Sequence, residues 1–563
     1  MNNVLYALLR RLRLPLITMI LVYSVSILGF VLIPGVDDQG NAYRMDFFHA
    51  FYFVSFMGST IGFGEIPYAF TDGQRMWTLF TIYATVIAWL YGIGTILALI
   101  QEPVFGRMLR RRSFVRKVQG ITEPFYLVCG YGVTGEIIVN KLGQRGIRSV
   151  VIDINESKID SLEISGNLPF EVPGLCADAS LPDVLDDAGL QHDKCVGVLA
   201  LTNVDQVNLS VAIASKLLRP ERIVISRTES DTTTANLLSF GTDLVVDPFR
   251  VYAEYLSLAA HAPYTHLVYD WLVNPYHRPL SSAYKKTKGR WIICGYGRFG
   301  SALYREFNEE HVELTVVDSN PEMDAGLPYM VRGKGTEALT LSEARVEDAV
   351  GIIAGTNNDA DNLSIIMTAR EMNKNLVTVV RQNVHANKLV FKNSKADFIM
   401  EPGQIIANRV LAHLKSPLLP VFIEQMQAYD DVWAHTLLNR MNSVTQEEEL
   451  DSWSVRVDEE NSPALIEMLN SGVDVNLGVL LKDPRDRTQS LSAFPLMLHT
   501  DDIYDILPGE LDVLKPGDEI LFCGKSKSLR RMEWTMNNFN TLHYLLTGNE
   551  PTGNLLSRIL NRQ

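Results

Sequence analysis

The sequence predicts an α-helical membrane domain with two spans, followed by two doubly wound α/β domains and a small β-rich C-terminal lobe. Three observations predict this fold class. Two long uncharged segments lie near the N-terminus, a glycine-rich turn between a strand and a helix occurs twice further on, and one Pro-Gly-Asp turn lies between apolar runs near the C-terminus. A duplicated strand–turn–helix pattern indicates duplicated domains, each with a mostly parallel sheet.

Length and charge narrow the classes of function. A chain of 563 residues favours several domains. The 65 acidic and 51 basic residues give a formal charge of −14, which argues against broad nucleic-acid binding. Five cysteines without a C-x-x-C pair fit a reduced, cytosolic setting for the bulk of the chain. Cys129 and Cys294 end strand-like runs, so we expect small buried core residues there rather than redox or metal sites.

Two segments are apolar and long enough to cross a bilayer. Residues 14–33 and 76–100 carry no charge, and each covers the roughly 20 residues that a spanning helix needs. A cleaved signal peptide is the alternative for the first span, but an obvious small-x-small cleavage site is missing and a second span follows. Arginines flank the pair on both outer sides and the connecting segment is acidic, so both ends are expected in the cytoplasm.

The segment between the spans begins with an aromatic-rich stretch, residues 45–60, that is too short to cross. It is typical of a re-entrant helix, with Asp46 as its N-cap. The glycine-rich peptide TIGFGE follows at residues 60–65. Non-helical backbone at membrane depth is tolerated only where protein buries it or water lines it. A glycine-rich peptide after a re-entrant helix therefore predicts a pore.

TIGFGE resembles the potassium-channel filter sequence T-V-G-Y-G-D. In that family four chains aim backbone carbonyls inward to replace the hydration shell of K⁺. The resemblance implies a homotetramer whose K⁺ ligands are the carbonyls of Thr60, Ile61, Gly62 and Phe63, with Gly64 completing the filter. Phe63 lacks the hydroxyl that tethers the filter in that family, whereas Glu65 keeps the acid at the outer mouth.

The second span contains candidate gating residues. Gly92 and Gly94 are typical either of a close-packing helix surface or of the hinge of a pore-lining helix. The sequence does not choose between these two roles. Leu97 and Ile100 follow, where an apolar ring could close the pore by dewetting.

A dinucleotide-binding fingerprint occurs twice. Each copy runs from a strand through G-x-G-x-x-G into a helix and a second strand that ends in aspartate. The copies contain Gly130, Gly132, Gly135 and Asp153, and Gly295, Gly297, Gly300 and Asp318. The glycines would let a pyrophosphate approach the helix N-terminus. The aspartates would accept hydrogen bonds from ribose hydroxyls, which favours NAD or an adenine nucleotide over NADP.

The repeat continues in LALTNVDQVN and IAGTNNDADN, and in VISRTE and TVVRQN. These Rossmann-like features resemble the RCK domains (regulators of potassium conductance) of prokaryotic channels and transporters over residues 124–435, and LDVLKPGDEILFCG resembles the family's single C-terminal lobe. The resemblance implies that the two clefts are also lined by Thr202, Asn203 and Arg227, and by Thr356, Asn357 and Arg381.

The two clefts need not bind the same ligand. The first copy has Asp178, the acid that contacts adenosine in several relatives, and the second has Lys334 at the matching place. Calcium is the family's other ligand class. Its calcium-gated channels carry paired acids where this chain has Arg227 and Glu229, so that calcium site is not expected here, and a divalent site elsewhere stays open.

We expect six segments along the chain: a membrane pore domain over 1–105, a linker over 106–120, a first RCK domain with linking helices over 121–288, a second over 289–435, the C-terminal lobe over 436–545 and a tail over 546–563. The leading hypothesis is a multi-pass potassium channel in the lipid of the cell (inner) membrane. Its RCK domains would form a cytoplasmic ring that NAD or ADP gates, with both termini in the cytoplasm.

Two alternatives are a membrane-anchored NAD-dependent oxidoreductase and a regulatory subunit of a K⁺ transporter. The oxidoreductase would leave the pore segment unexplained, and the sequence offers no Cys–His pair, metal-ligand cluster or matched proton donor after either fingerprint. Regulatory subunits of transporters lack a filter of their own. We therefore expect a channel without enzyme activity.

Overall fold

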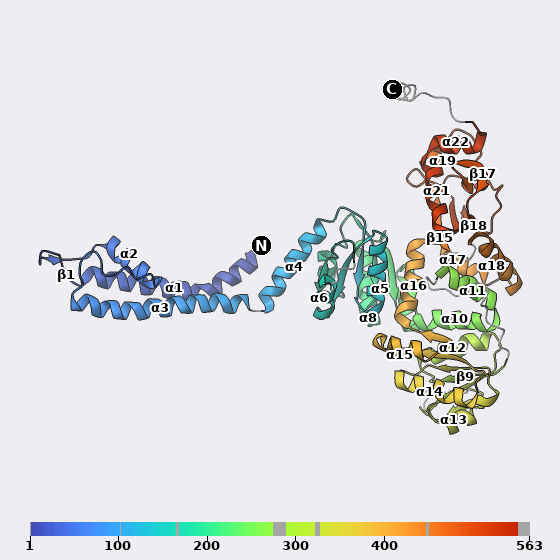
Figure 1. Cartoon of the computed structure of the whole chain (residues 1–563), viewed down its shortest axis with the longest axis horizontal. Helices are drawn as coiled ribbons and strands as arrows, with labels where there is room; N and C mark the ends of the chain where they lie inside the picture. The colour runs from blue at the N-terminus through green and yellow to red at the C-terminus, as the bar shows by residue number, and fades with distance from the viewer. Residues whose placement is uncertain are drawn as a thin grey trace. The chain divides into compact units, whose positions relative to one another are not determined.

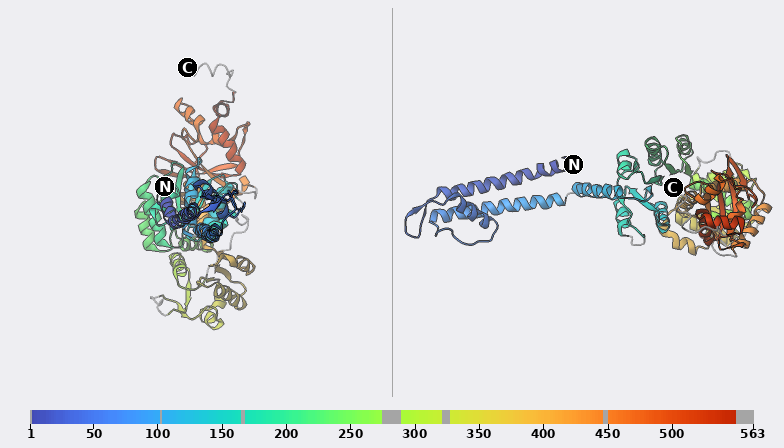
Figure 2. Two further views of the ribbon diagram at one scale, coloured as in Figure 1. Left: turned by 90° about the vertical axis from the view of Figure 1, so that its left-hand side faces the viewer. Right: turned by 90° about the horizontal axis from the view of Figure 1, so that it is seen from above.

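The computed structural model describes residues 2–101, 103–164, 168–273, 289–320, 327–445 and 450–549. It divides into two compact units, residues 1–116 and residues 117–563. Ribbon views of the chain are given in Figures 1 and 2.

The N-terminal unit is built on two long helices, α1 (Asn2–Leu32) and α3 (Asp72–Ile100), which lie side by side (Figures 1 and 2). Both are long and apolar enough to span a membrane, over Leu12–Leu32 and Asp72–Ala98. Helix α4 (Pro103–Gln119) follows α3, and a two-stranded hairpin, β1 (Gly35–Val36) and β2 (Ala42–Tyr43), lies in the connecting segment. The two spans expected from the sequence are thus helices of the expected length.

The short helix α2 (Phe47–Gly58) packs against both long helices. Its N-cap is Asp46, whose carboxylate accepts the backbone N–H of His49 at 2.7 Å. A cap of this kind stabilises a helix by about 1 kcal/mol. The inner face of α2 contributes Phe53, whose ring lies 4.9 Å from those of both Phe30 and Phe70. The sequence prediction of a short helix capped by Asp46 is confirmed.

Two six-stranded parallel sheets form the centre of the second unit. The first has the order β5-β4-β3-β6-β7-β8, with β3 (Phe125–Cys129), β4 (Arg148–Asp153), β5 (Gly174–Cys176), β6 (Cys195–Ala200), β7 (Ile223–Arg227) and β8 (Leu244–Val246). The second has the order β11-β10-β9-β12-β13-β14, with β9 (Trp291–Cys294), β10 (Leu314–Asp318), β11 (Met330–Arg332), β12 (Gly351–Ala354), β13 (Val377–Arg381) and β14 (Phe398–Met400). In such sheets the ligand crevice lies where the strand order reverses. Here that is between β3 and β6, and between β9 and β12.

Helices cover both sheets. In the first domain they are α5 (Val133–Gln144), α6 (Glu156–Ile164), α7 (Pro182–Asp187), α8 (Asp205–Leu218) and α9 (Asp231–Ser239). In the second they are α12 (Arg298–Glu309), α13 (Ala338–Glu343), α14 (Asp359–Met372) and α15 (Lys388–Asn393), with two 3₁₀ turns, η2 (Val346–Asp348) and η3 (His385–Asn387).

The linking helices are exchanged between the two domains. Helix α10 (Pro248–His261) follows the first sheet but packs against α12 of the second domain, and α16 (Pro402–Lys415) follows the second sheet but packs against α5 of the first (Figure 1). Phe249 of α10 is therefore buried with Phe299, and Val410 of α16 with Val139. Each domain completes the apolar core of the other.

The C-terminal lobe joins a four-stranded antiparallel sheet to short helices. The sheet order is β15-β20-β18-β19, with β15 (Asp451–Arg456), β18 (Ala493–Thr500), β19 (Ile503–Ile506) and β20 (Glu519–Gly524), beside a hairpin of β16 (Lys482–Asp483) and β17 (Asp486–Ser490). The helices of the lobe are α19 (Pro463–Asn470), α20 (Leu477–Leu480), α21 (Ser526–Asn537) and α22 (Phe539–Thr547). Helices α11 (Pro263–Val273), α17 (Leu418–Met426) and α18 (Asp431–Thr445) share a core with this sheet. Most of the expected tail, from residue 550 onward, lies outside the described residues.

Cys129 and Cys294 were predicted to be small buried core residues, and the structure places them so. Cys129 and Cys294 are buried at the ends of β3 and β9, and burial raises the pKa of Cys294 to about 12. At neutral pH its thiol therefore stays protonated and unreactive. Cys176, at the end of β5, is exposed.

Candidate functional site

The peptide TIGFGE has an alternating backbone. Thr60, Gly62 and Gly64 have φ values of +62°, +68° and +103°, whereas Ile61 and Phe63 between them stay outside the positive region. Alternation between positive and negative φ values turns successive peptide groups, so that like atoms can gather on one side. A left-handed conformation costs a residue such as threonine about 1–2 kcal/mol. Strain of this kind in a non-glycine residue points to a functional constraint.

Helix α2 holds the start of this peptide. The backbone N–H groups of Thr60 and Ile61 donate to the carbonyls of Met57 and Phe56 at 3.1 and 3.0 Å. The Phe63 ring meets the Phe56 ring edge-on, with centroids 5.5 Å apart. Phe63 thus makes an apolar ring contact and has no hydroxyl that could form a hydrogen bond.

The candidate gating residues lie in an unbroken helix. A Cβ atom added at Gly92 or Gly94 would meet nothing within 4 Å, so neither glycine packs closely against another of the residues that the structure describes. Leu97 is half exposed, at 52%. The side chain of Ile100, at the end of α3, lies outside the described residues. The roles of Gly92 and Gly94 as a hinge or packing surface, and of Leu97 and Ile100 as an apolar ring, stay predictions, because each depends on contacts between several chains.

The glycines of the two fingerprints divide into three roles. Gly130 and Gly295 have φ values of +104° and +96°, which the turn after the strand requires. A Cβ atom on the third glycine would lie about 2 Å from the carbonyl oxygen of the first: 2.2 Å for Gly135 and 2.0 Å for Gly300.

The middle glycines are different. A Cβ atom on Gly132 would come no nearer than 3.9 Å to another group, and one on Gly297 would meet nothing within 4 Å. The fold itself does not need glycine at these two positions. The open space fits the close approach of a bound phosphate group.

Both fingerprint aspartates hold the glycine turn. Asp318 accepts the N–H groups of Tyr296 and Asn320 at 2.6 and 2.8 Å. Asp153 makes the same pair of hydrogen bonds in the first domain, with Tyr131 and Asn155. A carboxylate oxygen can accept a further hydrogen bond, so a ribose hydroxyl can still be bound. This second, structural role could not be read from the spacing.

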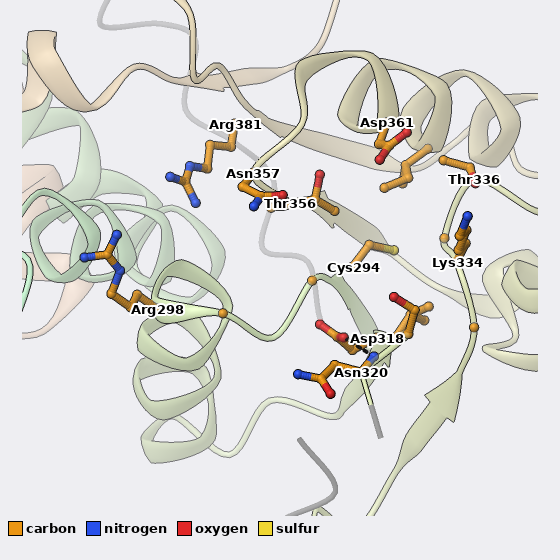
Figure 3. Close-up of a pocket in the computed structure, with 18 residues that line it drawn as sticks. Cys294, Arg298, Asp318, Asn320, Lys334, Thr336, Thr356, Asn357, Asp361 and Arg381 are labelled. Atoms are coloured by element: carbon orange, nitrogen blue, oxygen red, sulfur yellow. Dashed lines mark hydrogen bonds between the residues drawn. The ribbon is translucent and has the colours of Figure 1, made fainter. Parts of the chain in front are cut away.

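A cavity of about 440 Å³ opens over the second fingerprint. Figure 3 shows Arg298 and Arg381 at one end, Lys334 and Thr336 at the other, and Asp318 with Asn320 along one side. The residues that were predicted for this cleft and line it are Gly295, Gly297, Asp318, Lys334, Thr356, Asn357 and Arg381. The cleft is thus an elongated site with a basic group at each end.

In the first domain the predicted residues occupy corresponding places. Thr202 and Asn203 follow β6, Arg227 ends β7 and contacts Asn203, and Asp178 follows β5. Asp178 is exposed and accepts the N–H of Ser180 at 2.9 Å. An acid therefore stands two residues after β5, at the place that Lys334 takes after β11 in the second domain.

Two families match the chain. TrkA-N domains match residues 126–248 and 291–402, and the ion channel family matches residues 16–102. Together they cover more than half of the sequence. The chain therefore joins an ion channel region to two TrkA-N domains. The resemblance to two-span potassium channels with tandem RCK domains is confirmed in this form.

The curated relatives that match the chain include potassium channel proteins and Trk system potassium uptake proteins. Potassium channel protein 1 of Methanocaldococcus jannaschii is 29% identical over 208 residues, which are 37% of this chain and 60% of that protein. Probable potassium channel protein 2 of the same organism is 27% identical over 180 residues, 30% of this chain and 49% of that protein. The chain thus spans about half the length of these relatives.

Among solved structures, the GsuK channel is similar over 95% of this chain and 99% of that chain, at 16% identity and a TM-score of 0.46. The GsuK channel bound to NAD matches over the same shares, at 16% identity and a TM-score of 0.45. These TM-scores are low, so the family assignment rests on the sequence matches.

Buried asparagines support the cleft loops of both TrkA-N domains. Asn362 accepts the N–H of Thr356 at 2.9 Å and donates to the carbonyl of Arg381 at 2.8 Å. Asn208 makes the same contacts with Thr202 and Arg227. Both asparagines belong to the repeated sequence segments. Their role in connecting two separate loops could not be predicted from sequence, because it depends on which loops lie side by side in the fold.

One carboxylate joins the two TrkA-N domains. Glu229 of the first domain contacts Arg227 of the same domain and accepts from Arg298 of the second at 2.7 Å. Arg381 lies nearby, with its guanidinium 4.8 Å from the centre of the Phe249 ring. Burial lowers the pKa of Arg381, an effect that Glu229 opposes and Arg298 adds to.

The contacts of Glu229 also bear on calcium. Arg227 and Arg298 surround the position where calcium-gated relatives were expected to carry acids. Among the residues that the structure describes, no group of three or more His, Cys, Asp or Glu side chains is placed to hold a metal ion. A divalent site stays a prediction without assigned residues.

Replacing Glu229 with glutamine should destabilise the TrkA-N unit. The change leaves Arg227 and Arg298 without their shared carboxylate, and hydrogen bonds to charged groups contribute about 1.5–3 kcal/mol. Asp231→Asn is the matched control, because Asp231 also faces the second domain, 3.8 Å from Arg305, but is 81% exposed. Urea unfolding should show a clear loss for Glu229→Gln and almost none for Asp231→Asn. Equal unfolding midpoints would contradict this role of Glu229.

Proposed function

We propose that the chain is one subunit of a K⁺-selective channel in which four copies surround a single pore. The TrkA-N domains and both termini lie in the cytoplasm, and NAD or ADP bound to these domains controls opening. The observation that carries the proposal is the alternating positive φ at Thr60, Gly62 and Gly64 in a filter-like sequence directly after a capped short helix.

The pore assignment follows from what such a backbone can do. Carbonyl groups gathered on one side can replace the water around a K⁺ ion when several chains contribute them. The carbonyls of Thr60, Ile61, Gly62 and Phe63 would be these ligands. The side chains of Ile61 and Phe63 are 60% and 67% exposed in a single chain, which fits a peptide that other copies cover.

The nucleotide assignment follows from the second cleft. A pyrophosphate at the N-terminus of α12 would meet the open space at Gly297 and the charge of Arg298. Asp318 would bind the ribose, and Lys334 would lie at the adenosine end. The first domain repeats the glycine turn and the aspartate but has Asp178 in place of the lysine.

Gating needs a difference in affinity. A bound nucleotide shifts the channel between closed and open only as far as it binds one state more tightly. A coupling of about 1–3 kcal/mol per site is usual, and several sites in a ring add up to a large shift. The exchanged helices α10 and α16 each follow one TrkA-N domain along the chain and pack against the other, so a conformational change in one domain can be passed directly to the other.

The test is ion flux into liposomes that hold the purified full-length protein. We expect uptake of K⁺ in preference to Na⁺, altered when NAD or ADP is present on the side of the TrkA-N domains. Selective flux that ignores nucleotide would retain the pore and refute ligand control. Absence of flux, or turnover of NADH with a substrate, would overturn the channel in favour of an oxidoreductase.

A further inference from the structure

Glu65, the residue directly after the filter peptide, is held at both carboxylate oxygens. Its Oε1 accepts from Nε of Arg75 at 2.9 Å, and its Oε2 accepts from Nη2 of the same arginine at 3.3 Å. The backbone N–H of Phe70 donates to Oε2 at 2.8 Å. A two-point arginine–carboxylate pair is stronger and more directional than a single ionic contact.

Both partners of Glu65 belong to packed elements of the N-terminal unit. Arg75 lies in the first turns of α3. Phe70 is 6% exposed, and its ring packs against Phe30 and Phe53 at centroid distances of 5.8 and 4.9 Å. One carboxylate thus ties the outer end of residues 60–64 to a long helix and to the aromatic core.

The filter peptide has reason to need such a tie. Gly62 and Gly64 give its backbone freedom, and Phe63 meets Phe56 through an apolar ring contact that has little directional preference. The start of the peptide is attached to α2 through the N–H of Ile61. Glu65 supplies the directional contact at the other end.

We propose that Glu65 and Arg75 form an outer anchor of the filter, a positioning pair that keeps residues 60–64 in their conducting conformation. This inference rests on the proposed function. The anchor does the work that a tyrosine hydroxyl at position 63 would do. Without it, the pore still assembles, but its selectivity falls and its current decays during sustained conduction.

Arg75 separates this role from a simple effect of surface charge. Removing its positive charge makes the outer mouth more negative, which by charge alone would raise local K⁺ and increase conductance. Loss of an anchor has the opposite effect. Asp72 provides a matched control, because its carboxylate lies 3.9 Å from Arg75 but its side chain is fully exposed.

The experiment compares Arg75→Gln, Arg75→Lys, Glu65→Gln and Asp72→Asn in the full-length protein, in planar bilayers, after each variant is shown to elute as the same oligomer. We expect the K⁺/Na⁺ permeability ratio to fall about two- to fivefold in Arg75→Gln and in Glu65→Gln, the range that matches the loss of an ion pair whose side chains are 56% and 37% exposed. Arg75→Lys should be intermediate, because lysine keeps the charge but not the two-point geometry. Asp72→Asn should be unchanged.

The double variant Glu65→Gln with Arg75→Gln should have the same permeability ratio as either single variant, because the two substitutions remove the same contact. Higher conductance in Arg75→Gln, with selectivity and current stability unchanged, would overturn the anchor. If a glutamine variant does not assemble, Arg75→Lys decides by the same two readouts. Absence of selective flux in the unaltered protein would overturn the proposed function and the anchor together. If the anchor alone is wrong, the unaltered protein still conducts K⁺ selectively.

Discussion

Replacing Gly62 or Gly64 with alanine is expected to abolish K⁺-selective flux while the membrane unit stays folded. Both glycines have positive φ, and an alanine there resists the conformation by about 1 kcal/mol or more. A Cβ atom at either position would meet nothing within 4 Å among the described residues of the chain, so the substitution leaves their packing intact. The loss would therefore come from the backbone that presents the carbonyls. The measurement is the ratio of K⁺ to Na⁺ uptake in liposomes, with thermal unfolding recorded in parallel.

Gly40 is the matched control for this experiment. It has φ +86° and open space around its Cβ position, but it lies in the turn between β1 and β2. Gly40→Ala therefore carries the same backbone strain without touching the filter peptide. Flux in Gly62→Ala equal to that in Gly40→Ala would show that the alternating backbone is not the conducting element.

The features that could be predicted from sequence are those built from neighbours along the chain. Asp46 caps α2 through a hydrogen bond to a residue three positions away, so its type and place were enough to indicate the helix start. The glycine turns and the strands around them are equally local. The second cleft could be assigned because parallel strands bring their carboxyl ends to one edge of the sheet.

Contacts between distant segments could not be predicted in this way. The resemblance to RCK domains implies that the linking helices α10 and α16 pack against a neighbouring domain, but the periodicity of their apolar faces indicates burial alone. The contact of Glu229 with Arg298 depends on that exchange, so it could not be predicted from the sequence alone. The pairing of Glu65 with Arg75 depends on how the loop returns to α3. In each case the residue types were ordinary, and only the three-dimensional path of the chain gave them a role.

Gly297→Ala and Gly300→Ala, three residues apart in one turn, are expected to fail in opposite ways. A methyl group at Gly300 would lie 2.0 Å from the carbonyl oxygen of Gly295, so Gly300→Ala should destabilise the second TrkA-N domain by about 1–3 kcal/mol or more. Gly297 has φ −74° and open space at its Cβ position, so alanine there should leave stability unchanged or raise it by about 0.4–1 kcal/mol. Under the proposed nucleotide binding, a bound phosphate would meet the new methyl group. Urea unfolding of the two variants tests this contrast.

Nucleotide binding then assigns the ligands to the domains. If NAD or ADP uses the second cleft, Gly297→Ala should weaken its binding about tenfold or more in calorimetry of the detergent-solubilised protein, a loss of about 1.4 kcal/mol. Gly132→Ala is the equivalent change in the first cleft, where the nearest group to a Cβ atom is Lys158 Nζ at 3.9 Å. A ligand weakened by one variant and not by the other belongs to that cleft. Unchanged binding of both nucleotides in both variants, with folding intact, would mean that neither middle glycine lies against a bound nucleotide and that the nucleotides act elsewhere.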